Sequence, residues 1–230
     1  MSEILFIHPH TLLDNIGKII NKVGSEKFFS SPEEDVKKAR EGFFAYFFTL
    51  AMKKYTNRDW WLTQYPEAVR NYPDFDLISV GDETNPIIVE KVELTGVYPH
   101  FENFEKMMEV INKKKNKYGN KSLDFSLLIF INHEKSEDYL DFLRKNLISH
   151  DPFISIWTIH LRFKNPMEVK RVVACRISPG PFERIEADID DPKIHKLQSL
   201  PDFLDSKQVD GSQFFSFKPN FIKSYLKRKK

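Results

Sequence analysis

The sequence has few of the residues on which covalent crosslinks, phosphate-cradling loops and membrane spans depend. Among its 230 residues there is a single cysteine, Cys175, which excludes an intrachain disulfide and suits a reducing compartment. With only 8 glycines and no Gly-rich motif, the chain offers no loop for cradling a nucleotide phosphate. No apolar run is long enough to cross a bilayer, and no basic segment precedes an apolar stretch near Met1. We therefore expect neither a membrane span nor a signal peptide, and a cytoplasmic location.

An excess of charge of one sign is also missing. The formal net charge of +2 is too small to indicate nucleic-acid binding by itself. Basic residues do gather in the tail from 223 to 230, where Lys227 and Arg228 could contact phosphates. Hydrophobic residues make up 41% of the chain and include 21 phenylalanines, which indicates a globular protein with a Phe-rich core.

Periodicity predicts an α/β fold with a mixed central sheet flanked by helices. The motif from Ser31 to Glu34 reads as a capping box that starts a helix ending near Lys53. Further segments are expected as helices over Phe101–Tyr118 and Ser136–Leu147 and as strands over Phe125–Ile131, Phe153–Phe163 and Lys170–Ser178. Beyond residue 181 the chain becomes polar and interrupted by prolines. We expect a lead-in over 1–30, a core domain over 31–180 and a loosely packed extension over 181–230.

Two short apolar runs with acidic residues carry the strongest indication of chemistry. The runs 72–80 and 87–94 are separated by a polar, Pro-containing connection, so they are expected to be adjacent strands. Asp74 and Asp76 lie on the first run, and Glu90 and Glu93 lie on the second beside Lys91. Carboxylate oxygens on neighbouring strands are ligands that Mg²⁺ prefers, and a lysine beside them can hold a phosphate.

The segment from Pro73 to Ile78, followed by Ile88-Val89-Glu90-Lys91, resembles the PD-(D/E)XK nuclease superfamily. The similarity covers about residues 31–131. It implies a restriction-endonuclease-like fold and metal-dependent hydrolysis of phosphodiester bonds, with DNA as the expected substrate and partner. In that family an aspartate on one strand and an acid-x-Lys triplet on the next hold Mg²⁺ (or Mn²⁺) and assist the attack of water.

Carried over to this chain, the resemblance implies Asp76 and Glu90 as the metal ligands, with Asp74 as the next candidate on the first strand. Lys91 would assist catalysis. Glu34 or Glu41 on the first helix could add a carboxylate. Contacts with nucleic acid are expected from Arg70 and Lys106 as well as from the tail.

The lysine of the motif is displaced in this sequence, because Lys91 directly follows Glu90 and Val92 stands where the family has lysine. In a regular strand, Glu90 and Lys91 point to opposite faces. A β-bulge could bring them together, or the catalytic pair could be Glu93 with Lys91. Alternatively, the lysine could come from the second helix, where Lys106 is the obvious donor. Otherwise the chain is a catalytically inactive, nuclease-like module that binds nucleic acid or protein. The sequence leaves these alternatives open, together with the question of a homodimer.

Overall fold

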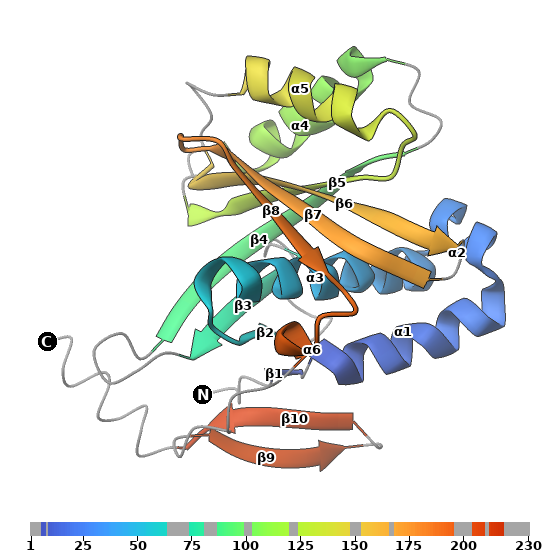
Figure 1. The fold of residues 1–230 in the computed structure, drawn as a ribbon, viewed down its shortest axis with the longest axis vertical. Helices are drawn as coiled ribbons and strands as arrows, with labels where there is room; N and C mark the ends of the chain where they lie inside the picture. The colour runs from blue at the N-terminus through green and yellow to red at the C-terminus, as the bar shows by residue number, and fades with distance from the viewer. Residues whose placement is uncertain are drawn as a thin grey trace, which may run out of the picture.

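The computed structural model describes residues 6–7, 9–63, 74–80, 87–98, 103–119, 124–147, 153–165, 168–195, 204–209 and 212–218. Within these ranges the chain forms one mixed sheet with helices on both faces (Figure 1), which confirms the predicted α/β class. The helices are α1 Pro9–Val23, α2 Ser25–Ser30, α3 Glu34–Thr56, α4 Phe104–Tyr118, α5 Ser136–Asn146 and α6 Pro192–His195. The strands are β1 Phe6–Ile7, β2 Trp60–Thr63, β3 Phe75–Val80, β4 Ile87–Val97, β5 Ser126–Ile131, β6 Ser155–Asn165, β7 Glu168–Ser178, β8 Glu183–Asp188, β9 Leu204–Val209 and β10 Ser212–Phe217.

The sheet places its strands in the order β8-β7-β6-β5-β4-β3-β2-β1-β10-β9. β2, β3 and β4 form an antiparallel meander, whereas β4, β5 and β6 run parallel to one another. The parallel strands are joined by crossovers that contain α4 and α5, as parallel pairing requires. From α3 to β5 the chain therefore runs as helix, three antiparallel strands, helix and parallel strand.

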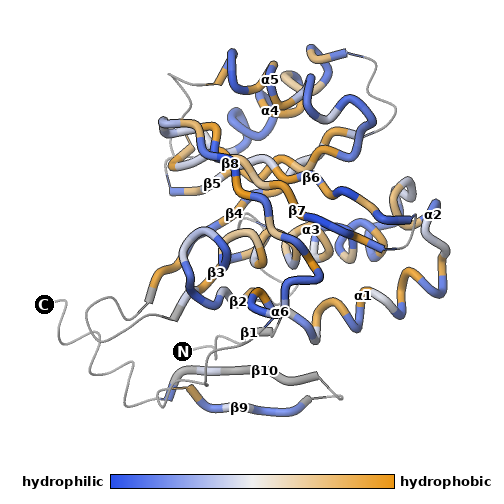
Figure 2. Tube along the Cα trace, viewed as in Figure 1, coloured by the Kyte–Doolittle hydropathy of each residue, from blue (hydrophilic) through white to orange (hydrophobic). Residues whose placement is uncertain are grey.

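Two hydrophobic layers hold the helices on the sheet. On one face, Phe44 of α3 stacks on Phe130 of β5 with ring centroids 4.1 Å apart. On the other face, α4 and α5 bury Ile111 and Leu143 against the sheet. β5 is buried at every position because helices cover both of its sides, and Figure 2 shows the hydrophobic central strands between helices of alternating hydropathy. Within the described ranges, no helix is long and apolar enough to cross a membrane.

The predicted start of the long helix is wrong by a few residues. α3 begins at Glu34, its N-cap Glu33 makes no side-chain cap, and Pro32 lies outside the helix. Ser31 Oγ instead accepts a hydrogen bond from the Glu33 amide at 3.1 Å, which turns the chain just before the helix. Ser31 therefore acts in a turn, and the capping box is not formed.

The expectation of a loosely packed chain after residue 181 is also wrong for a large part of that segment. β8 pairs antiparallel with β7, so the sheet continues across the boundary expected at residue 180. β9 and β10 form an antiparallel pair, and β10 joins the other edge of the sheet through β1. These strands are short, and exposed residues follow Leu204 on β9. Edge strands of this kind have no continuous apolar run that periodicity can detect.

Candidate active site

The most concentrated group of charges lies between the meander and α4. Glu93, in the middle of β4, has a fully buried side chain and forms an ion pair with Lys114 of α4. The Lys114 ammonium also lies 3.9 Å from Oδ2 of Asp74, the residue directly before β3. One cation therefore reaches two carboxylates from neighbouring strands. The charges of Asp74 and Lys114 also act on Glu41 of α3. We name Glu41, Asp74, Glu93 and Lys114 the carboxylate–lysine cluster.

Asp74 and Glu93 are held by different kinds of contact. Asp74 Oδ2 accepts a hydrogen bond from the backbone amide of Leu94 at 2.6 Å, which joins the start of β3 to β4. The Tyr118 hydroxyl donates a hydrogen bond to Glu93 Oε2 at 2.5 Å, and Lys117 lies 3.6 Å from Glu93 Oε1. Glu93 is therefore surrounded by groups from the last two turns of α4, and a buried carboxylate is stable only with such partners.

The pKa values of Asp74 and Glu41 in this cluster reflect burial first and crowded negative charge second. Burial and then the charge of Asp74 raise the pKa of Glu41 to about 7, although Lys37 and Lys114 offset part of the effect. Burial and then Glu93 raise the pKa of Asp74 above its usual range. Burial lowers the pKa of Lys114, but the charges of Asp74 and Glu93 outweigh it, so its net pKa is raised. The nearby lysines do not fully compensate the charge of Asp74 and Glu41.

The predicted pairing of Asp76 with Glu90 is not formed. In the β3–β4 ladder Asp76 lies opposite Lys91, while Glu90 lies opposite Leu77. Directly opposed residues project from the same face, and neighbours along a strand alternate, so Asp76 and Glu90 are on opposite faces. No register shift interrupts this ladder, so a β-bulge does not bring Glu90 and Lys91 to one side.

Glu90 belongs to a different polar group on the α3 face. Its Oε1 accepts hydrogen bonds from Ser126 at 2.6 Å and Ser155 at 3.3 Å. Ser155 in turn accepts a hydrogen bond from the Trp157 indole at 2.9 Å. Glu90 is half-buried, and neutral hydroxyl groups satisfy its carboxylate. We therefore interpret Glu90 as part of the packing between the parallel strands.

The predicted basic residues are spread over several places. Lys91 shares a face with Asp76, and its amine lies 5.8 Å from the centre of the Phe125 ring. Lys106 lies in the first turn of α4, exposed and 3.3 Å from Glu109, so it does not reach Glu93. Arg70, Lys227 and Arg228 lie outside the described residues, and their expected contacts with nucleic acid stay predictions.

Lys114 is the site residue that sequence reasoning missed. It stands in a basic run near the end of α4, where lysines are favourable for the helix dipole in any case. The spacing of Met107, Ile111, Lys114 and Tyr118 places Lys114 on the buried stripe of the helix. A lysine on the apolar stripe of an amphipathic helix needs a buried anionic partner, and this signal was available in the sequence.

The donor atoms of the cluster suit a divalent metal ion of the Mg²⁺ type. They are carboxylate oxygens, and the pKa values of Asp74 and Glu41 are raised by burial first and by a neighbouring carboxylate second, both of which a bound divalent cation would offset. Among the described residues no three His, Cys, Asp or Glu groups converge on one point as they stand. Lys114 lies between Asp74 and Glu93, so an ion would have to displace its ammonium or bind beside it.

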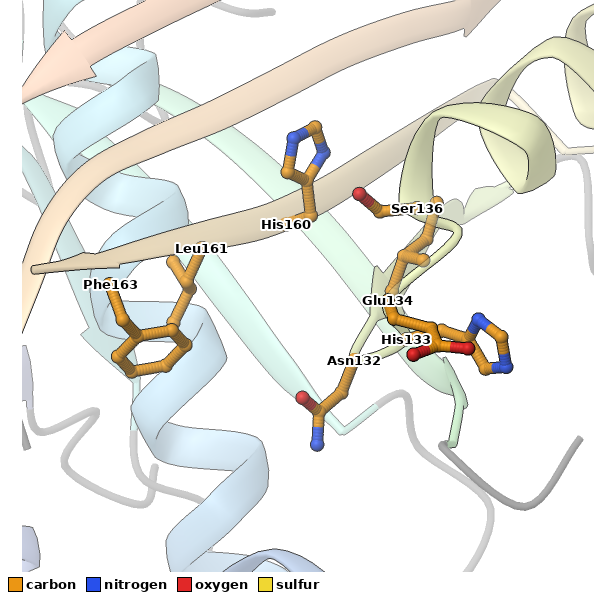
Figure 3. Close-up of a pocket in the computed structure, with 8 residues that line it drawn as sticks. Asn132, His133, Glu134, Ser136, His160, Leu161 and Phe163 are labelled. Carbon is orange, nitrogen blue, oxygen red and sulfur yellow. The ribbon is translucent and has the colours of Figure 1, made fainter. Parts of the chain in front are cut away.

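A cavity of about 220 Å³ lies at the carboxyl end of β5, apart from the carboxylate–lysine cluster (Figure 3). It is lined by Asn132 and His133 after β5, Ser136 at the start of α5, and His160 and Phe163 of β6. Figure 3 shows the rings of His133 and His160 apart and not converging on one point. Burial lowers the pKa of His160 to about 4, so the ring is neutral at pH 7.

Next to this cavity, Glu137 of α5 holds two arginines, in what we name the Glu137–arginine network. Arg184 donates two hydrogen bonds to Glu137, at 2.8 and 2.9 Å, and Arg162 donates a third at 3.1 Å. The bond from Arg184 is the main cause that lowers the pKa of Glu137 to about 2. This carboxylate is fully compensated, which is typical of a structural ion pair.

The cavity and the carboxylate–lysine cluster lie at opposite ends of α4. Tyr139 of α5 donates a hydrogen bond to the carbonyl of Asn103, the N-cap of α4, at 3.5 Å, whereas Lys114 and Tyr118 lie in the last turns of that helix. A helix of this length spans about 20 Å. The two sites can therefore be changed by mutation independently.

Comparisons with models of protein families, with curated proteins and with solved structures found no match for this chain.

Proposed function

We propose that this chain is a metal-dependent nuclease of the PD-(D/E)XK type that hydrolyses phosphodiester bonds in DNA. The observation that carries the proposal is the contact of one lysine, Lys114, with carboxylates from two neighbouring strands, Asp74 and Glu93. The elements around these residues follow the order that the resemblance implies, namely α3, the meander of β2 to β4, α4, and β5 parallel to β4.

The proposal changes which residues carry the motif. Asp74 follows Pro73 directly, as the aspartate of the motif should, and Glu93 takes the place of the acid on the next strand. Two residues after Glu93 stands Thr95, which cannot supply an ammonium group. Lys114 of α4 would replace the missing strand lysine. The sequence left open that a lysine of the second helix takes this role, and Lys114 would do so in place of Lys106.

Each residue then has a chemical task. Asp74 and Glu93, assisted by Glu41, would hold Mg²⁺ or Mn²⁺, which when bound neutralises phosphate charge and makes water a better nucleophile. Lys114, released from its carboxylates, would orient the scissile phosphate by a charge-assisted hydrogen bond. The exposed Lys117 in the last turn of α4 would attract the nucleic-acid backbone.

A catalytically inactive, nucleic-acid-binding module is the second candidate. It is favoured by one observation: both oxygens of Glu93 already have partners on α4, Lys114 and Lys117 at Oε1 and Tyr118 at Oε2. A carboxylate compensated in this way binds an added cation more weakly.

The test is cleavage of single- and double-stranded DNA by the purified full chain with Mn²⁺. Asp74→Asn should lower the rate by about 10³-fold, because loss of a metal ligand removes several kcal/mol of transition-state stabilisation. Asp138→Asn on α5 is a matched control and should cut like the wild type. Equal cutting by the wild type and Asp74→Asn would reveal a contaminant and contradict the proposal. Salt-dependent binding of DNA without cutting by the wild type would support the second candidate.

A further inference from the structure

The carboxylate of Glu93 is held at one of its two oxygens by a tyrosine. The Tyr118 hydroxyl donates to Glu93 Oε2 at 2.5 Å and accepts a hydrogen bond from Lys117 Nζ at 2.8 Å. The other oxygen of Glu93, Oε1, contacts Lys114, which also approaches Asp74. The two oxygens of one carboxylate therefore have different tasks, one toward Tyr118 and one toward the carboxylate–lysine cluster.

Packing fixes the position of the Tyr118 hydroxyl. The tyrosine is 8% exposed at the last residue of α4, and its ring meets Phe125 edge to face with centroids 5.0 Å apart. The Lys117 amine lies 4.6 Å from the centre of the same ring, so it contacts both the π face and the hydroxyl. A buried ring with both neighbours in place leaves the hydroxyl little freedom to turn away from Glu93.

We infer that Tyr118 is a positioning residue for the metal site: by holding Glu93 Oε2, it turns Oε1 toward Asp74, where a divalent cation would bind. This inference rests on the proposed function, because it concerns the same site. Lys117 supports Tyr118 through the hydroxyl and ring contacts, but it also lies 3.6 Å from Glu93 Oε1, where its charge competes with an ion, so its net effect should be weaker.

Hydrogen-bond partners that orient a metal-ligating carboxylate contribute to metal affinity without touching the ion. Their loss typically costs 10- to 100-fold in affinity or activity. Tyr118→Phe keeps the ring and its contact with Phe125 but removes the donor, so Glu93 would no longer have a fixed orientation. We expect the dissociation constant for Mn²⁺ to rise by at least about 10-fold in this variant.

The experiment is a calorimetric titration of Mn²⁺ into the full-length wild type, Tyr118→Phe, Lys117→Met and the control Lys113→Met, an exposed lysine of the same helix. Circular dichroism checks that each variant is folded. The expected order of Mn²⁺ affinity is wild type and Lys113→Met highest, then Lys117→Met, then Tyr118→Phe. A purely structural role of Tyr118 would lower the unfolding temperature but leave the Mn²⁺ affinity of the folded protein unchanged.

Two results would overturn the inference, and they differ in what else they overturn. If the wild type binds Mn²⁺ and folded Tyr118→Phe binds it equally well, Tyr118 does not position Glu93, while the proposed function stands. If the folded wild type binds no Mn²⁺, the proposed metal-dependent function fails and the inference fails with it.

Discussion

Asp74 and Glu41 of the carboxylate–lysine cluster and Glu137 of the Glu137–arginine network have pKa shifts in opposite directions. Glu137 is half exposed and receives three hydrogen bonds from two arginines, which lower its pKa to about 2. The side chains of Asp74 and Glu41 are less exposed, at 25% and 19%, and Lys114 and Lys37 compensate them only in part, so their pKa values are raised. The network stabilises charge that it already has, whereas the cluster holds charge that would be better compensated by a further cation.

This difference distinguishes a structural ion pair from a candidate binding site. Strongly perturbed pKa values alone do not, since both regions have them. The direction of the shift is more informative. A carboxylate with a lowered pKa is stabilised in its ionised form by its partners. A carboxylate with a raised pKa destabilises the fold when it ionises, and a bound cation could offset that loss. Three variants can break or sharpen the comparison.

The largest effect is expected for Lys114→Met. If Lys114 orients the phosphate, removing its ammonium should lower the cleavage rate by about 10²- to 10³-fold, as for the loss of other transition-state donors. Binding of Mn²⁺ should not weaken, because the ammonium competes with the ion for Asp74 and Glu93. Steady-state rates and Mn²⁺ titrations measure the two effects separately, and a parallel loss of both would contradict the competition.

A pH-dependent gain in stability is expected for Glu41→Gln in buffer with a chelator. The folded-state pKa of Glu41 is about 7, above the unfolded value of 4.5, so the wild type loses stability as the pH rises between these values. Glutamine does not ionise, so the variant should match the wild type near pH 4.5 and be more stable by about 3 kcal/mol above pH 8. Urea unfolding at several pH values tests this, and a pH-independent difference would argue against it.

The smallest effect, and of opposite sign, is expected for Glu137→Gln. Its folded-state pKa of about 2 lies below the unfolded value, so its contribution to stability is present above pH 4.5 and is lost as the pH falls toward 2. Because 51% of the side chain is exposed, solvent screening limits the loss to about 1–2 kcal/mol at pH 7. Urea unfolding beside Glu134→Gln, an exposed neighbour, measures it, and DNA cleavage should not change.

The parts of the fold that the sequence predicted are those with a strong apolar pattern. The helix Phe104–Tyr118 and the strand Ser126–Ile131 were expected within three residues of their ends, because each carries a clear periodicity. β8, β9 and β10 were missed because they are short edge strands of mixed polarity, whose pairing depends on β7 and β1. Tertiary pairing decides such strands, and local sequence does not show it.

The candidate site could be predicted as residue types but not as an arrangement. Asp74, Glu93 and Glu41 were all named, yet Asp76 with Glu90 was preferred because those residues fit a short motif. Which residues oppose each other depends on the register of β3 against β4, and the length of the connecting loop does not fix it. Lys114 comes from a helix about 20 residues further along the chain, so only packing brings it to Glu93.

The central claim is that the carboxylate–lysine cluster binds a divalent cation in the folded state. Thermal unfolding of the wild type and of Asp74→Asn in a chelator and in Mn²⁺ tests it most directly. A ligand at 100 times its dissociation constant stabilises the folded state by about 2.7 kcal/mol, which raises the unfolding temperature of a chain of this size by roughly 5–10 °C. We predict this rise for the wild type and a much smaller one for Asp74→Asn; an unchanged wild type, or an equal rise in both proteins, would contradict the claim.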